Sequence, residues 1–208
     1  MKYDVVIVAS GKGERADLGF NKVFYQMKDG RSVLEHALNL FVADEDCVKI
    51  IVVTNPDRLD VIKGAKIVCT AGGRERKDSV ANGLALVESD YVLIHDAARP
   101  FLHQNALCKI KDMLREYDAL VLGHMAIDTL KEVAEGKVIR TIDRRHIFMA
   151  ETPQAFNSSL IRDCYKRCAD VNFTDDASLV ESLGHEVHIV IDEYDNPKLT
   201  RKEDFVGL

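Results

Sequence analysis

The sequence predicts an α/β protein with a mostly parallel, twisted sheet that carries helices on both faces. Short, continuous apolar runs recur along the chain, which is typical of strands covered on both sides. Segments with apolar residues at helical spacing separate these runs, and this alternation favours parallel strands joined by crossover helices. Ligands of such sheets bind outside the carboxyl ends of the strands, so the polar residues after each apolar run are the candidates for a site.

The first part of the chain supplies most of the expected elements. Residues 5–9 form an apolar run that ends at glycines, and Ser32 with Glu35 forms a capping box that opens a helix. The other elements expected before residue 125 are strands at 48–54, 66–69, 91–94 and 119–122 and helices at 78–87 and 104–117.

The regular alternation stops after Met125. Residues 127–133 and 138–142 read as two strands around a turn at 134–137, which predicts a protruding β-hairpin. An isolated two-stranded hairpin is marginal in water, so we expect it to pack on something else, with a second subunit as the candidate. Alternation then resumes with helices at 158–169 and 174–184, a strand at 186–191 and a final helical turn capped by 200–203.

Length and charge limit the class of protein. The chain has 208 residues, which suits one compact domain, and its formal net charge of −6 argues against nucleic-acid binding. It has no apolar run near the roughly 20 residues of a membrane span. The N-terminus leads straight into a strand-like run without a signal-peptide pattern. We therefore expect a cytoplasmic protein that binds neither membrane nor nucleic acid.

Five cysteines are present and none lies in a C-x-x-C pair, which indicates free thiols in a reducing compartment. Cys164 and Cys168 are four residues apart on one helix face, but they have no partners at the spacing of a zinc site. We expect no metal site built from protein ligands.

A glycine-rich loop follows the first strand. Gly11 and Gly13 let the backbone approach a ligand closely, and successive N–H groups there can bind an anion. Arg15 and Lys22 add full positive charge to the same loop, which suits a triphosphate. A dinucleotide site would need a third glycine where Ala16 stands, and a P-loop would need Gly-Lys-Ser/Thr. A plain glycine turn with solvated charges is the structural alternative.

Two further clusters follow later strands. Gly72 to Ser79 reads as a β-to-α turn, where Ser79 either contacts a base or phosphate or only caps the helix. His95 to Pro100 directly follows a buried strand. Asp96 there can accept substrate hydroxyls, hold magnesium through water, or pair with Arg99, and His95 is expected to be a packed strand-end residue rather than a base.

Taken together, these clusters resemble a known family over nearly the whole chain. The matching motifs are Gly11-Lys12-Gly13-Glu14-Arg15, Lys22, Gly72-Gly73 with Arg76, Asp78 and Ser79, His95-Asp96-Ala97-Ala98-Arg99-Pro100, Asp128-Thr129-Leu130-Lys131, Asp143-Arg144, Thr152-Pro153-Gln154, Thr174-Asp175, and Asn196-Pro197-Lys198-Leu199-Thr200. This set resembles the 2-C-methyl-D-erythritol 4-phosphate cytidylyltransferases of the non-mevalonate isoprenoid pathway.

The resemblance implies a Rossmann-like three-layer α/β/α nucleotidyltransferase fold, with one domain over 1–208 and a β-arm at about 126–146 that forms a homodimer. It implies transfer of the cytidylyl group of CTP to the alcohol phosphate, with Mg²⁺ bound mainly through the CTP phosphates. The implied roles are transition-state stabilisation by Arg15 and Lys22; positioning of the attacking phosphate by Arg144 and Lys198; CTP binding by Ala9, Ser10, Gly11, Gly13, Gly73, Ser79 and Ala97; and binding of the alcohol phosphate by Asp96, Arg99, Thr129, Arg144, Thr152, Thr174 and Lys198.

Four positions depart from the family pattern. Ser10 stands where a second alanine is usual, Arg74 where an acidic or small residue is common, and Met125 where proline precedes the arm. Asn21 replaces the proline before Lys22, which predicts a less stiff approach to that lysine. Two alternatives stay open: a ribitol 5-phosphate cytidylyltransferase, and a non-catalytic nucleotide-binding regulator on the same fold.

Overall fold

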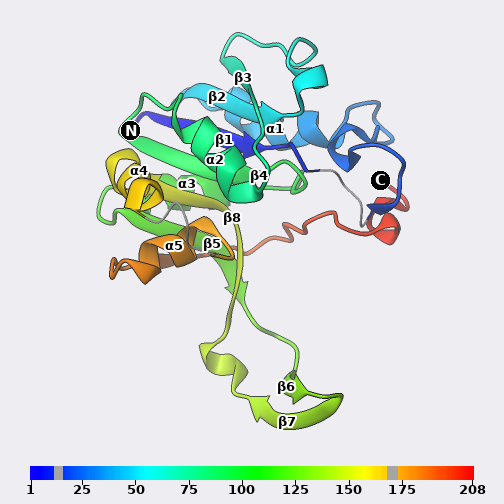
Figure 1. Ribbon diagram of the computed structural model, residues 1–208, viewed down its shortest axis with the longest axis vertical. Helices are drawn as coiled ribbons and strands as arrows, with labels where there is room; N and C mark the ends of the chain where they lie inside the picture. Colours follow the sequence, from blue (N-terminus) through cyan, green and yellow to red (C-terminus); the bar gives the residue numbers. More distant parts are fainter. Residues whose placement is uncertain (12–15, 168–172) are drawn as a thin grey trace.

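The computed structural model describes residues 1–11, 16–167 and 173–208 and has the predicted α/β architecture (Figure 1). A seven-stranded sheet has the order β3-β2-β1-β4-β8-β5-β9, and a two-stranded sheet pairs β6 with β7. The strands are β1 (Tyr3–Val8), β2 (Cys47–Thr54), β3 (Ile67–Ala71), β4 (Tyr91–Asp96), β5 (Ala119–Met125), β6 (Leu130–Ala134), β7 (Lys137–Ile142), β8 (Phe148–Asn157) and β9 (His188–Ile191). The α-helices are α1 (Val33–Ala43), α2 (Arg76–Leu84), α3 (Gln104–Met113), α4 (Ser158–Arg167) and α5 (Asp176–Ser182).

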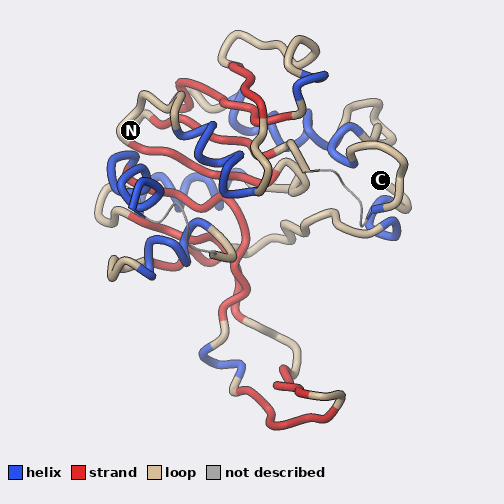
Figure 2. Tube along the Cα trace, viewed as in Figure 1, coloured by secondary structure: helices blue, strands red, loops and turns tan. Residues whose placement is uncertain are grey.

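Helices cover both faces of the large sheet, which confirms the predicted three layers (Figure 2). The alternating side chains of β1 show the division. Val5 and Ile7 pack with Leu38 of α1 and Ile110 of α3, whereas Val6 belongs to the core formed with α2, α4 and α5. Every second residue of a strand points to the same face, so one apolar run serves two cores.

The capping box predicted at Ser32 is confirmed. The Glu35 backbone N–H donates to the Ser32 hydroxyl at 3.2 Å, and the Glu35 carboxylate accepts the Ser32 backbone N–H at 2.6 Å. Helix α1 therefore starts where the sequence predicts, and its apolar side lies on the sheet.

Strand β8 was not predicted from the sequence. It lies antiparallel between β4 and β5, and its middle contains the polar residues Glu151, Thr152 and Gln154 together with Pro153. Proline cannot donate to a strand ladder, and the β5 pairing is irregular between Val121 and Gly123, opposite this segment. The apolar periodicity of a central strand is thus broken by polar side chains that the fold buries near the pocket described below.

The hairpin forms an arm that projects from the body of the molecule (Figure 1). Glu135 and Gly136, at its tip, have φ values of 50° and 75°, the left-handed backbone that a two-residue hairpin turn requires. Apolar side chains on the arm are exposed, among them Ile127 at 77% and Val133 at 62%. No helix in the described part of the chain is long and apolar enough to cross a bilayer.

Gly83 lets α2 approach the sheet closely, and this contact gives a stability prediction. A Cβ at position 83 would lie 2.5 Å from Val6 Cγ1 and 3.0 Å from Val53 Cγ2. Overpacking of this kind typically costs about 1–3 kcal/mol, which exceeds the intrinsic helical advantage of alanine. We expect Gly83→Ala to lower the free energy of unfolding by about 1–2 kcal/mol in urea denaturation. Ala81→Ser, on the exposed side of α2, is the control, and a Gly83→Ala protein as stable as wild type would contradict this packing.

Candidate active site

A pocket of about 790 Å³ opens at the carboxyl ends of the central strands, where the sequence predicted a site. Four chain segments at or after strand ends contribute to it: 8–11 after β1, 55–56 after β2, 72–76 after β3, and Asp96 at the end of β4. The residues that line it are Val8, Ala9, Ser10, Gly11, Asn21, Lys22, Val23, Asn55, Pro56, Gly72, Gly73, Arg74, Glu75, Arg76, Ser79, Asp96, Ala98 and Lys198.

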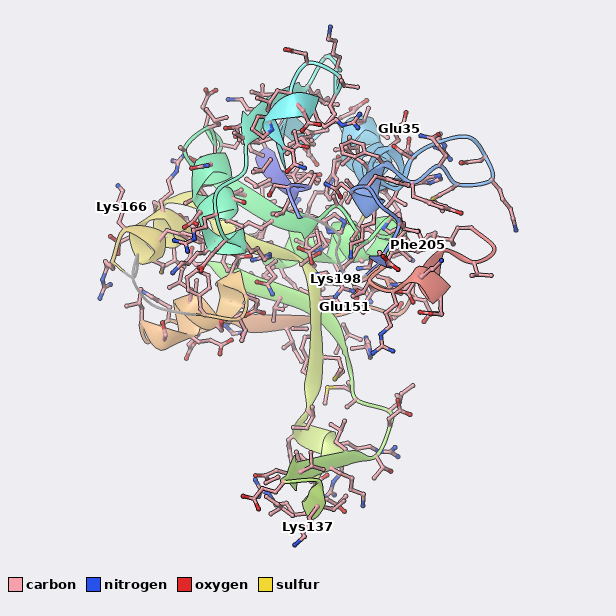
Figure 3. The ribbon with its side chains drawn as sticks, turned by 45° about the vertical axis from the view of Figure 1, so that its right-hand side comes forward. Glu35, Lys137, Glu151, Lys166, Lys198 and Phe205 are labelled. Atoms are coloured by element: carbon pink, nitrogen blue, oxygen red, sulfur yellow. The ribbon has the colours of Figure 1, made fainter. Side chains whose placement is uncertain are left out.

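Eight of the predicted site residues line this one pocket: Ala9, Ser10, Gly11, Lys22, Gly73, Ser79, Asp96 and Lys198. Lys22 and Lys198 are far apart in the sequence, and the fold brings both to the same cavity. Figure 3 shows Lys198 and Glu151 close to the point where the arm leaves the body. Gly13 and Arg15 lie outside the described residues, so their predicted roles stay predictions.

The remaining predicted residues lie elsewhere among the described residues. Ala97 and Thr152 are buried next to Asp96 or bonded to it. Thr174 lines a neighbouring cavity of about 90 Å³ that shares Glu75 and Arg76 with the pocket. Thr129 and Arg144 belong to the arm, where the Arg144 guanidinium donates to the Ile127 carbonyl. These two residues do not line the pocket of their own chain, and their contact with substrate stays a prediction.

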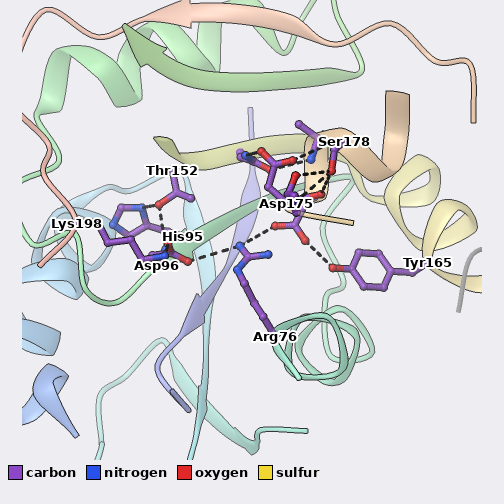
Figure 4. Close-up of polar contacts among 12 residues, drawn as sticks. Arg76, His95, Asp96, Thr152, Tyr165, Asp175, Ser178 and Lys198 are labelled. Carbon is purple, nitrogen blue, oxygen red and sulfur yellow. Dashed lines mark hydrogen bonds and ion pairs between the residues drawn. The ribbon is translucent and has the colours of Figure 1, made fainter. Parts of the chain in front are cut away.

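Asp96 is the electrostatic centre of the pocket. Its carboxylate accepts a hydrogen bond from Lys198 Nζ at 2.6 Å, and the Arg76 guanidinium lies 3.6 Å away (Figure 4). Burial alone would raise the pKa of this carboxyl, but Arg76 and Lys198 lower it to about 2. The ion pair between Asp96 and Arg99 that the sequence left open is replaced by these two partners.

Arg76 is a site residue to which the sequence gave no role. Its guanidinium donates to Asp176 at 2.9 Å, and the other oxygen of Asp176 accepts the Tyr165 hydroxyl at 2.5 Å. Burial opposes the charge of Arg76, but Asp176 and Asp96 outweigh it and raise the pKa of the guanidinium. The available signals were the place of Arg76 in the Gly72–Ser79 cluster and the acidic pair that begins α5.

His95 is fully buried and organises the chain beneath Asp96. Its Nε2 lies 3.0 Å from the Arg99 carbonyl, which only accepts, so Nε2 carries the proton. Nδ1 therefore accepts the Thr152 hydroxyl at 3.0 Å, and the Thr152 oxygen accepts the Asp96 backbone N–H at 3.0 Å. Burial lowers the pKa of His95 to about 4, so the ring is neutral at pH 7.

Arg99 supports the segment that carries Lys198. Its guanidinium donates to the Asn196 carbonyl at 2.5 Å and lies 3.7 Å from the Glu151 carboxylate. The Asn196 side chain in turn donates to the Thr152 carbonyl at 2.9 Å. These contacts fix the residue two positions before Lys198, and the predicted contact of Arg99 with substrate stays a prediction.

The wall formed by Ser10, Ser79 and Gly72 is tightly packed. Ser79 is 1% exposed, and its hydroxyl lies 3.0 Å from the Ser10 hydroxyl and accepts the Gly73 backbone N–H at 3.0 Å. A Cβ at Gly72 would lie 2.3 Å from Ser10 Cβ, so only glycine fits there without displacement. The wall therefore presents backbone and two small hydroxyl side chains.

Protein ligands for a metal ion are few in this pocket. Glu75 and Asp96 are the acidic residues among those that line it, and Asp96 already faces two cations. No cluster of three His, Cys, Asp or Glu suitable for a metal occurs in the described ranges. Among the described residues, the pocket could therefore offer a divalent cation at most these two carboxylates.

A three-layer α/β/α body whose pocket at the strand ends is lined by Lys22, Arg76 and Lys198 is typical of an α/β protein that binds a phosphorylated ligand. The family model described as 2-C-methyl-D-erythritol 4-phosphate cytidylyltransferase (IspD) matches residues 3–207. The chain belongs to this family.

Individual relatives agree with the family match. A curated protein of that name from Halalkalibacterium halodurans is 38% identical, with 99% of this chain and 95% of that protein covered. One of the same name from Aquifex aeolicus is 40% identical over 97% and 93%. The crystal structure of the Francisella tularensis protein of that name has a TM-score of 0.86 at 28% identity, covering 99% of this chain and 97% of that one.

The buried His95 predicts a pH dependence of stability. Its pKa is about 4 in the folded protein against 6.5 ordinarily, so the unfolded state binds its proton first as the pH falls. Stability from this group is complete above about pH 6.5 and is lost between there and about pH 4, by up to about 3 kcal/mol. We expect the free energy of unfolding of His95→Gln, measured by urea denaturation, to fall less steeply with decreasing pH across this window than that of wild type. Parallel pH profiles of wild type and variant would contradict the assignment.

Proposed function

We propose that the protein transfers the cytidylyl group of CTP to 2-C-methyl-D-erythritol 4-phosphate, a step in isoprenoid biosynthesis. The observation that carries this proposal is the convergence of Lys22, Lys198 and the Gly11 loop on one pocket in a chain of this family. A phosphate oxygen of the alcohol phosphate attacks the α-phosphorus of CTP in line. The bond from that phosphorus to the bridging oxygen breaks, and pyrophosphate leaves.

Charge neutralisation and positioning supply most of the catalysis in such a transfer. Lys22, with Arg15, faces the negative charge that develops around the five-coordinate phosphorus. The attacking phosphate is already ionised, so no general base is needed, which agrees with a neutral, fully buried His95. Lys198, held by Asp96, and Arg144 orient the attacking phosphate.

The two substrates take opposite parts of the site in this proposal. CTP lies along Ala9, Ser10, Gly11 and Gly13, with its cytidine end towards Gly73, Ser79 and Ala97. The alcohol phosphate lies near Asp96, Arg99, Thr152 and Thr174, with Thr129 and Arg144 supplied by the arm. Magnesium bound by the CTP phosphates would reduce the charge that the lysines must neutralise.

We further propose that the chain is one cytidylyltransferase domain that works as a cytoplasmic homodimer, with the arm at about 126–146 reaching into the neighbouring subunit's site. Two features support this arrangement. The arm projects from the body, and its apolar residues Ile127, Val133, Val138 and Ile139 are exposed in the single chain. Thr129 and Arg144 lie on the arm and do not line the pocket of their own subunit.

The choice of substrate is tested by comparing two alcohol phosphates. With CTP and magnesium, we expect fast pyrophosphate release on addition of 2-C-methyl-D-erythritol 4-phosphate and much slower release with ribitol 5-phosphate, measured by a coupled phosphate assay. Comparable or faster release with ribitol 5-phosphate would reverse the substrate assignment. Binding of CTP without release in either case would favour the non-catalytic regulator.

The shared site is tested by subunit complementation. Lys22→Ala alters the body of a site and Arg144→Ala alters the arm, so a mixed dimer keeps one intact site only if the arm acts on the partner. We expect each variant alone to lose at least about a hundredfold in turnover and the co-expressed pair to regain about a quarter of wild-type activity. The control pairs Lys22→Ala with Lys198→Ala, both in the body, and should regain nothing. No recovery in the first pair would contradict the trans arrangement.

A further inference from the structure

We propose that Asn21 is a positioning residue that sets the place of Lys22 in the pocket by bridging the end of β1 to the short helix that carries this lysine. The inference rests on the proposed function only for the role of Lys22. The bridge itself consists of side-chain hydrogen bonds within the protein.

The nitrogen and the oxygen of the Asn21 side-chain amide each make a hydrogen bond. Nδ2 donates to the Ala9 carbonyl at 2.8 Å, and Oδ1 accepts the Val23 backbone N–H at 3.3 Å. Asn21 is thereby the N-cap of the 3-10 helix η2 (Lys22–Phe24), and its own carbonyl accepts the Phe24 N–H at 3.0 Å. One side chain thus joins the two ends of the loop that begins after β1.

Ala9, whose carbonyl accepts the Asn21 hydrogen bond, is itself held by the sheet. The Ala9 backbone N–H donates to the Val53 carbonyl at 2.8 Å, which continues the pairing of β1 with β2. On the other side of Lys22, Val23 is buried in the core with Leu34 and Leu38 of α1. Lys22 therefore lies between Asn21, which is bonded to the carboxyl end of β1, and Val23, which is packed in the core. Lys22 itself lines the pocket.

Asn21 was expected to make the approach to Lys22 less stiff than proline would, and its side chain supplies two hydrogen bonds that proline lacks. Asn21 has φ −65° and ψ 116°. A proline ring fixes φ near this value, whereas asparagine is free to leave it unless its side chain is held. The two hydrogen bonds hold Asn21 at the angle that a ring would impose. Because a displacement of about 1 Å at a catalytic group can cost about a hundredfold in rate, the bridge bears directly on turnover.

The first test is steady-state kinetics of three substitutions. Asn21→Ala removes the bridge and frees φ, Asn21→Asp cannot donate to the Ala9 carbonyl, and Asn21→Pro keeps φ without the bridge. We expect kcat to fall at least about tenfold for the Ala and Asp variants with KM for CTP changed less than about threefold, and the Pro variant to recover most of kcat. Lys22→Ala gives the kcat expected when the lysine is lost altogether. Asn105→Ala, which removes the 3.1 Å hydrogen bond from another asparagine amide to the Tyr194 hydroxyl outside the pocket, should match wild type.

A second measurement needs no substrate. Amide hydrogen exchange at Val23 should be faster in Asn21→Ala than in wild type, because its N–H loses the Asn21 oxygen. Unchanged exchange would overturn the bridge. Faster exchange with unchanged kcat, a loss confined to KM, or a Pro variant as slow as the Ala variant would each overturn the positioning role. If wild type itself releases no pyrophosphate, the proposed function fails, while the exchange result still decides the bridge.

Discussion

The placement of Asp96 between two cations is the interaction on which the rest of the site depends. A pocket for polyanionic substrates needs several positive groups close together, and these repel one another unless an acid lies among them. Asp96, at the end of β4, meets Lys198 from the C-terminal segment and Arg76 from α2. Its buried carboxylate stays ionised because the same two groups lower its pKa to about 2. One charge thus joins three distant parts of the chain at the pocket that Lys22 also lines.

Strand β8 explains why the site and the arm belong to one structural unit. The arm leaves the body at the end of β5 and returns at the start of β8, and these strands pair as far as Met125 with Phe148. Further along, β8 supplies Thr152 to the hydrogen-bond network beneath Asp96. The base of the arm is therefore fixed by the same antiparallel pairing that positions the pocket, so its direction is set by the sheet.

Residues with strong local signals could be predicted from the sequence, and residues with long-range partners could not. The apolar run of β1 and the Ser32–Glu35 capping box depend on neighbours in sequence, so their patterns sufficed to place both. β8 was missed because Pro153 and buried polar side chains break its apolar pattern. The role of Arg76 was missed because its partners, Asp96 and Asp176, come from other elements. The hydrogen bond from Asn21 to Ala9 could not be predicted, because it spans a loop whose closure no local pattern records.

Several polar residues of the recognised motifs have their hydrogen-bonding groups paired within the protein. The Thr152 hydroxyl donates to His95 and accepts from Asp96, and the Ser79 hydroxyl contacts Ser10 and Gly73, so both are engaged within the protein. The Arg99 guanidinium is likewise turned to Asn196 and Glu151. Buried polar groups are costly unless paired. Thr152 and Arg99 therefore contribute first by fixing the backbone at Asp96 and Asn196, and Ser79 by fixing the turn at Gly73. Motif residues that are expected to contact ligand therefore also hold the backbone of the site in place. The buried network thus fixes the surroundings of Asp96 and Lys198 through contacts within the protein alone.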